Sequence, residues 1–252
     1  LPMGHRIMGR ILYLNEKINV ICWQDRHLER MARELSVYRP AVLEANPSLL
    51  ARLAFWALDN GKELYSPDVI VFTYELPSQI HLRAIRQVFS SPFASSYGTT
   101  ETGFVLMQCE DGLFHQNTDF CHIDYYPLAE RHGGPYLGRI LVTTFGNPWT
   151  SIVRFDVGDL IRLHPTGKCA CGRDQGMIAE AIEGRISNAT FTTHGGLVSP
   201  MALDTKLAQI PEIRDYHLEQ NSPAEFELQL VLTDNSKKVL DKIRETMAYL
   251  YG

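Results

Sequence analysis

Apolar residues recur at helical spacing near the start of the chain. Between residues 26 and 38, Leu28, Met31 and Leu35 fall on one face of a predicted helix. Upstream of this helix, alternating apolar positions predict one or two strands before Trp23. These positions are Leu12, Leu14, Ile18, Val20 and Cys22. The first part of the chain therefore mixes strand and helix.

This mixture continues as a regular alternation up to residue 95. Pro47 opens a predicted helix that stops at Asn60-Gly61, because proline is favoured in the first turn of a helix and glycine just beyond its end. A second helix is predicted at residues 77–89, and strands are predicted at residues 41–45, 69–73 and 93–95. Strands that alternate with helices predict a parallel sheet with helices on its faces.

The pattern then changes to short alternating runs, which predict an antiparallel, barrel-like region. These runs lie at residues 104–108, 120–126, 139–144, 152–155 and 160–163. Beyond residue 184 a compact mixture follows, with strands predicted at residues 216–220 and 226–232 and helices at 200–209 and 237–249.

We therefore predict an α/β protein made of a parallel-sheet layer, an antiparallel barrel-like subdomain and a small α+β domain. The first two form a large domain over residues 1–184, divided into an α/β part (1–103) and a β-rich part (104–184). The small domain covers residues 185–252 and follows a hinge at Gly184 to Ser187.

Composition narrows the class of protein without identifying a function. The 252 residues are 45% hydrophobic and 21% charged, which is ordinary for a globular protein. A net charge of -5 with no basic run argues against nucleic-acid binding. No apolar run is long enough for a membrane span. Five cysteines, an odd number, argue against a disulfide framework and favour a reducing compartment, so we expect a cytoplasmic location.

The most informative stretch is Tyr97-Gly98-Thr99-Thr100-Glu101-Thr102-Gly103. We expect it to be a loop that follows the strand at residues 93–95, at the carboxyl end of a parallel strand, where such sheets bind ligands. Its hydroxyls can donate to phosphate oxygens, its glycines allow close backbone approach, its carboxylate can hold magnesium and its aromatic ring can cover a base. A turn rich in glycine and threonine is also ordinary loop chemistry.

Two later segments strengthen the functional interpretation of this stretch. They are Ile152-Val153-Arg154-Phe155-Asp156-Val157-Gly158-Asp159-Leu160 and Glu183-Gly184-Arg185-Ile186-Ser187-Asn188. In this order the three segments resemble the adenylate-forming superfamily of AMP-producing acyl and aryl ligases, most closely its phenylacetate-coenzyme A ligase branch. The resemblance covers most of the chain.

The resemblance implies a role for each matching residue. Tyr97 would stack on adenine, Thr100 would contact the α-phosphate, and Glu101 would bind magnesium. Asp159 would hold the ribose hydroxyls, and Arg185 would reach the ribose or phosphate. We also assign nucleotide contacts to Gly98, Thr99 and Arg154. Taken singly, Asp159 is equally compatible with a turn residue after glycine, and Arg185 with a surface charge at a linker.

The resemblance implies a reaction in which a carboxylic acid is activated with ATP and Mg²⁺. Aryl acids are among the candidate substrates. The acyl-adenylate would be transferred to coenzyme A or to another nucleophile such as an amine or carrier. No nucleic-acid or membrane partner is expected, and the sequence does not specify an oligomeric state or the acid.

Two elements of the superfamily have no counterpart in the chain. The phosphate loop would precede the matching region, and the catalytic lysine would lie beyond Gly252. The second segment departs from the family pattern at Phe155-Asp156, and the hinge position is Ser187. We therefore expect either a fragment of a ligase or a reduced homologue, which would bind a nucleotide or a partner without catalysis.

A set of cysteines and one histidine predicts a metal site. Cys169 and Cys171 form a tight two-thiol knuckle, and Cys109 and His115 flank Glu110-Asp111-Gly112, which predicts a hairpin turn. If the two turns are neighbours, three thiolates and an imidazole would make a closed, structural zinc site. Some ligases that resemble this branch carry a cysteine-glycine-arginine knuckle of this kind. The one-residue spacing is tighter than usual, the pair Cys121-His122 competes for the role, and Cys22 is expected in the core.

Overall fold

The computed structural model describes residues 2–15, 19–146 and 149–252. The chain forms two compact units. One contains Leu1–Pro77 and His81–Phe93, and the other contains Ser78–Ile80 and Ala94–Gly252. The predicted boundary at Gly184 to Ser187 lies inside the second unit, and the hinge there stays a prediction.

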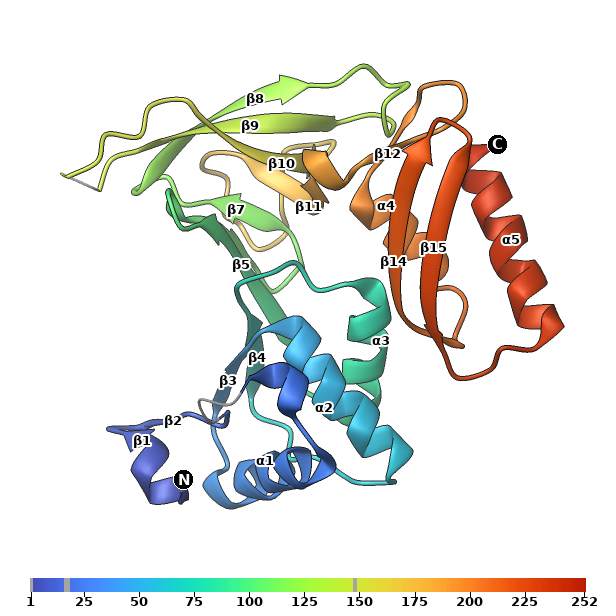
Figure 1. Cartoon of the computed structure of the whole chain (residues 1–252). Coiled ribbons are helices and arrows are strands. Elements are labelled where there is room, and N and C mark those ends of the chain that lie inside the picture. The colour runs from blue at the N-terminus through green and yellow to red at the C-terminus, as the bar shows by residue number, and fades with distance from the viewer. Residues whose placement is uncertain (1, 16–18, 147–148) are drawn as a thin grey trace. The chain divides into compact units, whose positions relative to one another are not determined.

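The first unit is a parallel pair of strands covered by helices (Figure 1). Strand β3 runs parallel to β4, with Val42 opposite Val69 and Ala45 opposite Phe72. The elements of this unit are β1 (Ile7–Met8), β2 (Ile11–Leu12), α1 (Asp25–Tyr38), β3 (Val42–Ala45), α2 (Pro47–Asp59) and β4 (Val69–Phe72), and most of α3 (Gln79–Val88). The predicted parallel layer and its helices are therefore confirmed.

Local signals set the ends of the helices in this unit. The Asn46 side chain accepts a hydrogen bond from the backbone N–H of Leu49 at 3.1 Å and caps α2, with Pro47 in its first turn. Helix α1 ends where Arg39 adopts a left-handed φ of 50°. The apolar faces pack against β4, whose Ile70 and Phe72 are almost fully buried.

The prediction for the segment before Trp23 is partly wrong. Leu12 lies in a short strand, but Val20–Cys22 forms a 3-10 helix, because the Asn19 side chain accepts a hydrogen bond from the N–H of Ile21 and turns the chain. Ile18 lies outside the described residues. Cys22 is exposed, so its expected place in the core is also wrong.

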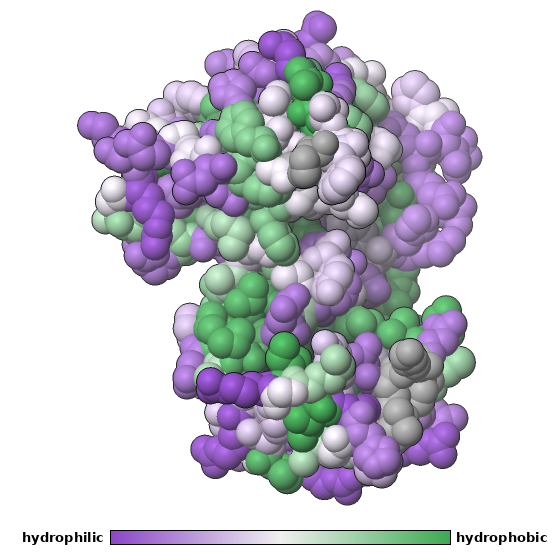
Figure 2. All heavy atoms as spheres, turned by 90° about the vertical axis from the view of Figure 1, so that its left-hand side faces the viewer, coloured by the Kyte–Doolittle hydropathy of each residue, from purple (hydrophilic) through white to green (hydrophobic). Residues whose placement is uncertain are grey.

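Apolar side chains also lie on the surface of the first unit. Figure 2 shows green, apolar atoms beside purple, polar ones on the face of this unit that is turned to the viewer. The largest exposed apolar side chains of the unit include Met8, Ile11, Val37, Val42 and Tyr74.

The second unit contains an antiparallel sheet with the strand order β5-β6-β7-β11-β10-β9-β8 (Figure 1). Its strands are β5 (Phe93–Thr99), β6 (Gly103–Gln108), β7 (Phe114–Gln116), β8 (Cys121–Pro127), β9 (Leu137–Thr144), β10 (Phe155–Leu163) and β11 (Ile178–Arg185). The predicted antiparallel region is confirmed. The expectation of separate strands at 152–155 and 160–163 is wrong, since β10 is one strand with an irregularity between Asp156 and Leu160, where Gly158 has a φ of +77°.

The C-terminal part of this unit is a mixed α and β region. It contains β12 (Thr190–Phe191), β13 (Leu197–Val198), α4 (Pro200–Leu207), β14 (Ile213–Ser222), β15 (Glu225–Leu232) and α5 (Lys237–Tyr251). Strands β14 and β15 pair antiparallel, with Leu218 opposite Leu228. In the described parts of the chain, no helix has the length and apolarity needed to cross a membrane.

A buried ion pair joins the sheet to the start of α4. The Arg162 Nε donates to Glu183 Oε1 at 2.6 Å, and Ser199, the N-cap residue of α4, donates its hydroxyl to the other oxygen of Glu183. Glu183 is 4% exposed and Ser199 1% exposed. Each oxygen of this buried carboxylate therefore has a donor, which offsets the cost of removing its charge from water.

Candidate functional site

The residues of the first sequence motif form a tight β-hairpin. Tyr97, Gly98 and Thr99 end strand β5, and Gly103 begins β6, so only residues 100–102 make the turn. The expectation that the whole motif is a loop after residue 95 is therefore wrong. The strand continues because Tyr97 pairs with Leu106 and Thr99 with Gly103 across the hairpin.

Two glycines make this hairpin possible. A Cβ atom at Gly98 would lie 2.0 Å from the carbonyl oxygen of Gly103, so only glycine fits between the strands. Gly103 has a φ of +68°, a region that favours glycine, and a Cβ added there would lie 3.1 Å from the ring of Phe120. The glycines thus set the shape of the turn that carries Thr100 and Glu101.

Hydroxyl groups hold the turn from within. The Oγ1 of Thr99 accepts the backbone N–H of Thr102 at 3.1 Å, and the two hydroxyl oxygens lie 3.0 Å apart. Thr102 is buried, while Thr100 and Glu101 are exposed at the tip. A hydrogen bond from Thr99 lowers the pKa of Glu101, and the backbone N–H of Glu101 and the charge of Arg185 lower it further. Glu101 is therefore an ionised carboxylate available to solutes.

Tyr97 reaches from this hairpin to the second motif. Its hydroxyl donates to Asp159 Oδ2 at 2.7 Å, and Arg185 Nε lies 3.4 Å from Asp159 Oδ1. Asp159 and Arg185 are partners in the ladder between β10 and β11, which explains why the second and third motifs meet. Three separate sequence segments thus converge on one carboxylate.

Burial and charge set the protonation state of Tyr97. Removal from water, followed by the negative charge of Asp159 and the hydrogen bond to it, raises the pKa of Tyr97 well above its usual value, so the phenol stays protonated. The Asp159 side chain is 9% exposed, whereas the Arg185 side chain is 60% exposed. The guanidinium is therefore open to solvent, whereas the Asp159 carboxylate is largely covered.

Arg154 lies just before β10 and has partners in β8 and β9. Its Nη1 is 3.5 Å from Asp124 Oδ2, its Nη2 donates to the hydroxyl of Tyr126, and its backbone N–H donates to Thr143 Oγ1 at 3.0 Å. Asp124 and Tyr126 belong to β8, and Thr143 belongs to β9. The structure thus brings Tyr97, Asp159 and Arg185 together, with Glu101 on the turn of the Tyr97 hairpin. It gives Arg154 other partners, so the assignment of Arg154 as a nucleotide contact stays a prediction.

The four predicted zinc ligands form a second cluster. Cys109 Sγ lies 3.6 Å from Cys169 Sγ, and Cys171 Sγ lies 3.4 Å from His115 Nε2. The four ligand atoms are all within 4.8 Å of one another. The predicted turn between Cys109 and His115 is present, with the N–H of Gly112 bonded to the carbonyl of Cys109. Three sulfurs and one imidazole nitrogen at these distances match the donor set of a structural zinc site.

The protonation state of His115 suits metal binding. Burial, and next the positive charge of Arg173, lower the pKa of His115, so its ring is neutral near pH 7, the form that binds metals. Arg173 also donates to Glu110 Oε2 at 2.7 Å and ties the two turns together. The competing pair, Cys121 and His122, is not among the residues whose ligand atoms gather in this cluster. Cys121 is buried, and burial raises the pKa of its thiol to about 11.

The sequence did not indicate the structural roles of three further residues. Thr102 is needed for the turn, but a threonine in a loop carries no signal for burial. Glu183 belongs to the third motif, but its carboxylate accepts a hydrogen bond from Ser199, the N-cap residue of α4. Asp111, whose carboxylate lies 3.5 Å from Cys169 Sγ, was treated only as a turn residue.

Comparisons with known proteins gave matches that cover most of the chain. No protein-family model matches it. Protein CapK of Staphylococcus aureus is 21% identical over 231 residues, which are 90% of this chain and 50% of that protein. The chain spans about half the length of the curated relative that it matches.

Solved structures with a similar fold include CoA ligases. A 2-hydroxyisobutyryl-CoA ligase in the postadenylation state, in complex with R3-HIB-AMP, superposes with a TM-score of 0.72 at 16% identity, covering 90% of this chain and 52% of the ligase. The anthranilate CoA ligase AuaEII in complex with anthranoyl-AMP gives a TM-score of 0.62 at 14% identity, covering 91% and 47%. The predicted resemblance to adenylate-forming ligases is thus confirmed for the fold.

Proposed function

We propose that this chain carries nucleotide- and acyl-handling residues of an AMP-forming carboxylate ligase. Such an enzyme activates a carboxylic acid with ATP and transfers the acyl group to coenzyme A or to another nucleophile. The observation that carries the proposal is the convergence of Tyr97, Asp159 and Arg185 beside the turn that holds Glu101. The fold shared with two CoA ligases that hold acyl-AMP molecules supports it.

Each residue of the convergent group suits one part of a nucleotide. The ring of Tyr97 offers a flat apolar face for adenine, while its hydroxyl holds Asp159. The Asp159 carboxylate can accept hydrogen bonds from two vicinal ribose hydroxyls, because a carboxylate has about four lone-pair sites. The exposed Arg185 guanidinium can donate to the ribose or to phosphate oxygens.

The turn residues suit the phosphate end. In the first step of the reaction, a carboxylate oxygen of the acid attacks the α-phosphorus, the bond to the bridging oxygen breaks, and pyrophosphate leaves with the electron pair. Negative charge builds on the phosphate oxygens, so donors are needed there. Thr100 would donate its hydroxyl, Gly98 and Thr99 would provide close backbone approach, and Glu101 would hold Mg²⁺.

The second step transfers the acyl group. The sulfur of coenzyme A forms a bond to the acyl carbon, AMP leaves with the electrons of the carbon–oxygen bond, and the thiol proton passes to solvent. We further propose that Cys109, His115, Cys169 and Cys171 hold a structural zinc ion that fastens two turns of the β-rich region.

Binding of AMP tests the nucleotide assignment directly. Isothermal titration of the 252-residue chain with AMP should give a one-site isotherm. Asp159→Ala and Arg185→Ala should each weaken binding by about tenfold or more, since each removes a charged hydrogen-bond partner. Asp156→Ala is the matched control, because this carboxylate lies on the same strand and pairs with Arg139 instead. Absence of AMP binding, or equal affinity of Asp159→Ala and the unmodified chain, would contradict the proposal.

Catalysis needs a separate measurement. ATP–pyrophosphate exchange by a full-length version that includes the phosphate loop and the catalytic lysine, with a panel of aryl and short acyl acids, should detect the first step. One acid should stimulate exchange above the rest. Glu101→Gln should then reduce exchange and raise the Mg²⁺ concentration needed for half-maximal rate. An unchanged magnesium dependence in Glu101→Gln would refute the role of Glu101 while leaving nucleotide binding to the test above.

A further inference from the structure

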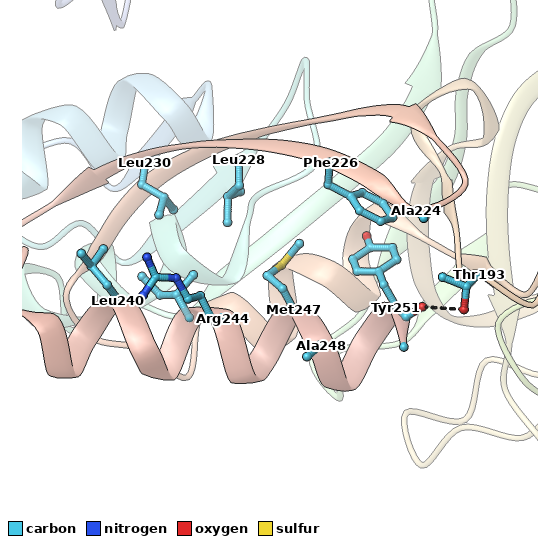
Figure 3. Close-up of a pocket in the computed structure, with 12 residues that line it drawn as sticks. Thr193, Ala224, Phe226, Leu228, Leu230, Leu240, Arg244, Met247, Ala248 and Tyr251 are labelled. Carbon is cyan, nitrogen blue, oxygen red and sulfur yellow. Dashed lines mark hydrogen bonds between the residues drawn. The ribbon is translucent and has the colours of Figure 1, made fainter.

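A cavity lies in the C-terminal region, between strand β15 and helix α5. It has a volume of about 480 Å³, within the range of about 300–1,000 Å³ that small-molecule pockets occupy. Figure 3 shows side chains of the strand pointing toward the helix and side chains of the helix pointing back, with open space along the seam. None of the residues of the nucleotide site or the zinc cluster lines it.

The walls of this cavity are apolar and incompletely packed. Leu228 and Leu230 line the strand side, and Leu240 and Met247 line the helix side. All four are half-buried, so they have not closed on each other as core residues do. Figure 3 shows Leu228 and Met247 facing one another near the middle of the seam. An elongated aliphatic group would fill this space, and the flexible Met247 side chain can adapt to it.

The polar groups at one end of the cavity are already engaged. The hydroxyl of Tyr251 lies 2.6 Å from Thr190 Oγ1, and the hydroxyl of Thr193 donates to the carbonyl oxygen of Tyr251 at 3.3 Å (Figure 3). The rings of Tyr251 and Phe226 pack with centroids 4.4 Å apart. This end is therefore suited to the apolar tail of a ligand.

Charge is provided by Arg244. It is the cation among the residues that line the cavity, and its side chain is 73% exposed. The Nη1 of Arg244 donates one hydrogen bond to Asp241 at 3.0 Å. A guanidinium has five N–H donors in a planar fork, so it can bind a second carboxylate beside the first. The cavity thus combines an apolar seam with a single cationic head position.

We propose that this cavity binds a linear aliphatic carboxylate, with the chain between β15 and α5 and the carboxylate on Arg244. The charge of Arg244 selects an anionic head over a neutral alcohol or an amine, and the single seam selects a straight chain over a bulky ring. The site is separate from the residues assigned to nucleotide and acid activation, and its existence does not depend on that function.

Sodium decanoate and 1-decanol provide a matched pair of probes for titration of the 252-residue chain. Chemical-shift changes of labelled methionine methyl groups should place decanoate at Met247, with saturable one-site binding. 1-Decanol should bind more weakly by about threefold to fivefold, since an exposed charge pair contributes modestly. No saturable shift at Met247, or equal affinity for the alcohol, would overturn the proposal.

Three single variants sharpen the test. Arg244→Gln should weaken decanoate binding to the level of 1-decanol, whereas Asp241→Asn should strengthen it, because a competing carboxylate is removed. Lys242→Gln is the matched control, since Lys242 is a cation of the same helix that does not line the cavity and lies 3.5 Å from the carbonyl oxygen of Gln209. Equal effects of Arg244→Gln and Lys242→Gln would show nonspecific attraction and reject the site, and circular dichroism would verify that each variant is folded.

Discussion

The hydroxyl of Tyr97 donates to Asp159 Oδ2 at 2.7 Å, although the two residues are 62 positions apart in the chain. The other oxygen of the same carboxylate faces Arg185. Because both oxygens have partners, the carboxylate is held in one orientation before any ligand arrives. Ordered polar groups of this kind reduce the cost of binding, since no side chain has to be fixed at that moment.

Removal of the Tyr97 hydroxyl should destabilise the protein. Tyr97→Phe keeps the ring but leaves a buried carboxylate with one donor fewer, and a hydrogen bond to a charged group contributes about 1.5–3 kcal/mol. We expect the free energy of unfolding, measured by urea titration, to fall by about 2 kcal/mol. The control is Tyr125→Phe, which loses a hydrogen bond to the neutral carbonyl of Tyr136 and should cost about 1 kcal/mol. A larger loss in the control would contradict the special role of Asp159.

The same hydroxyl should affect stability at alkaline pH. Burial and the charge of Asp159 raise the pKa of Tyr97 in the folded protein, while in the unfolded chain a tyrosine ionises near pH 10. The contribution of this tyrosine is therefore fully present below about pH 10 and is lost as pH rises further, at about 1.4 kcal/mol per pH unit. Tyr97→Phe should show a shallower decline of unfolding free energy between about pH 10 and 11 than the unmodified chain. Parallel declines would refute this assignment.

Gly98 should tolerate no side chain. A methyl group there would overlap the carbonyl of Gly103, which is backbone and cannot rotate away. We expect Gly98→Ala to cost about 2–3 kcal/mol in unfolding free energy and to displace Thr100 and Glu101. Gly167→Ala is a useful comparison, because no atom lies within 4 Å of its added methyl group and only its φ of +61° opposes the change. Equal stability of Gly98→Ala and the unmodified chain would show that the hairpin can open.

The sequence predicted those features of the fold that depend on local signals. Helix α2 begins at Pro47 and ends before Asn60 as expected, because proline and glycine act on the residues next to them. The strand β10 was divided into two, since the irregularity near Gly158 depends on pairing with β9 and not on nearby residues. The motif containing Tyr97 was expected to be a loop because its composition is that of a turn, whereas cross-strand pairing extends β5 through Thr99.

The same distinction applies to the candidate sites. Cys109 and His115 could be paired in advance, because a recognisable turn separates them. Residue types and order also indicated Asp159 and Arg185, but their opposition across β10 and β11 is a property of strand register. The partners of Arg154, which come from β8 and β9, depend on tertiary contacts that no local pattern reports.

Metal content tests the cysteine cluster. We expect elemental analysis of the purified chain to give about one zinc ion per chain and a chelator to lower the melting temperature, because a ligand that binds only the folded state stabilises it. Cys171→Ser should reduce the zinc content by more than half, as it removes one of four ligands. Cys22→Ser, an exposed thiol outside the cluster, is the control and should retain its metal. Zinc at the same level in both variants would contradict the ligand set.

The ion pair of Glu183 should be a major contributor to the stability of the second unit. Glu183→Gln leaves Arg162 without its carboxylate partner and weakens the cap of α4 through Ser199, so we expect a loss of about 3 kcal/mol in unfolding free energy. Asp241→Asn removes one partner of an exposed pair with Arg244 and should change stability by less than about 1 kcal/mol. The contrast follows from burial, because the Glu183 side chain is 6% exposed and that of Asp241 is 47% exposed. If urea titration gave the two variants equal stability, the buried carboxylate would have to be solvated in the native state, and hydrogen exchange at the first turn of α4 would then show early opening.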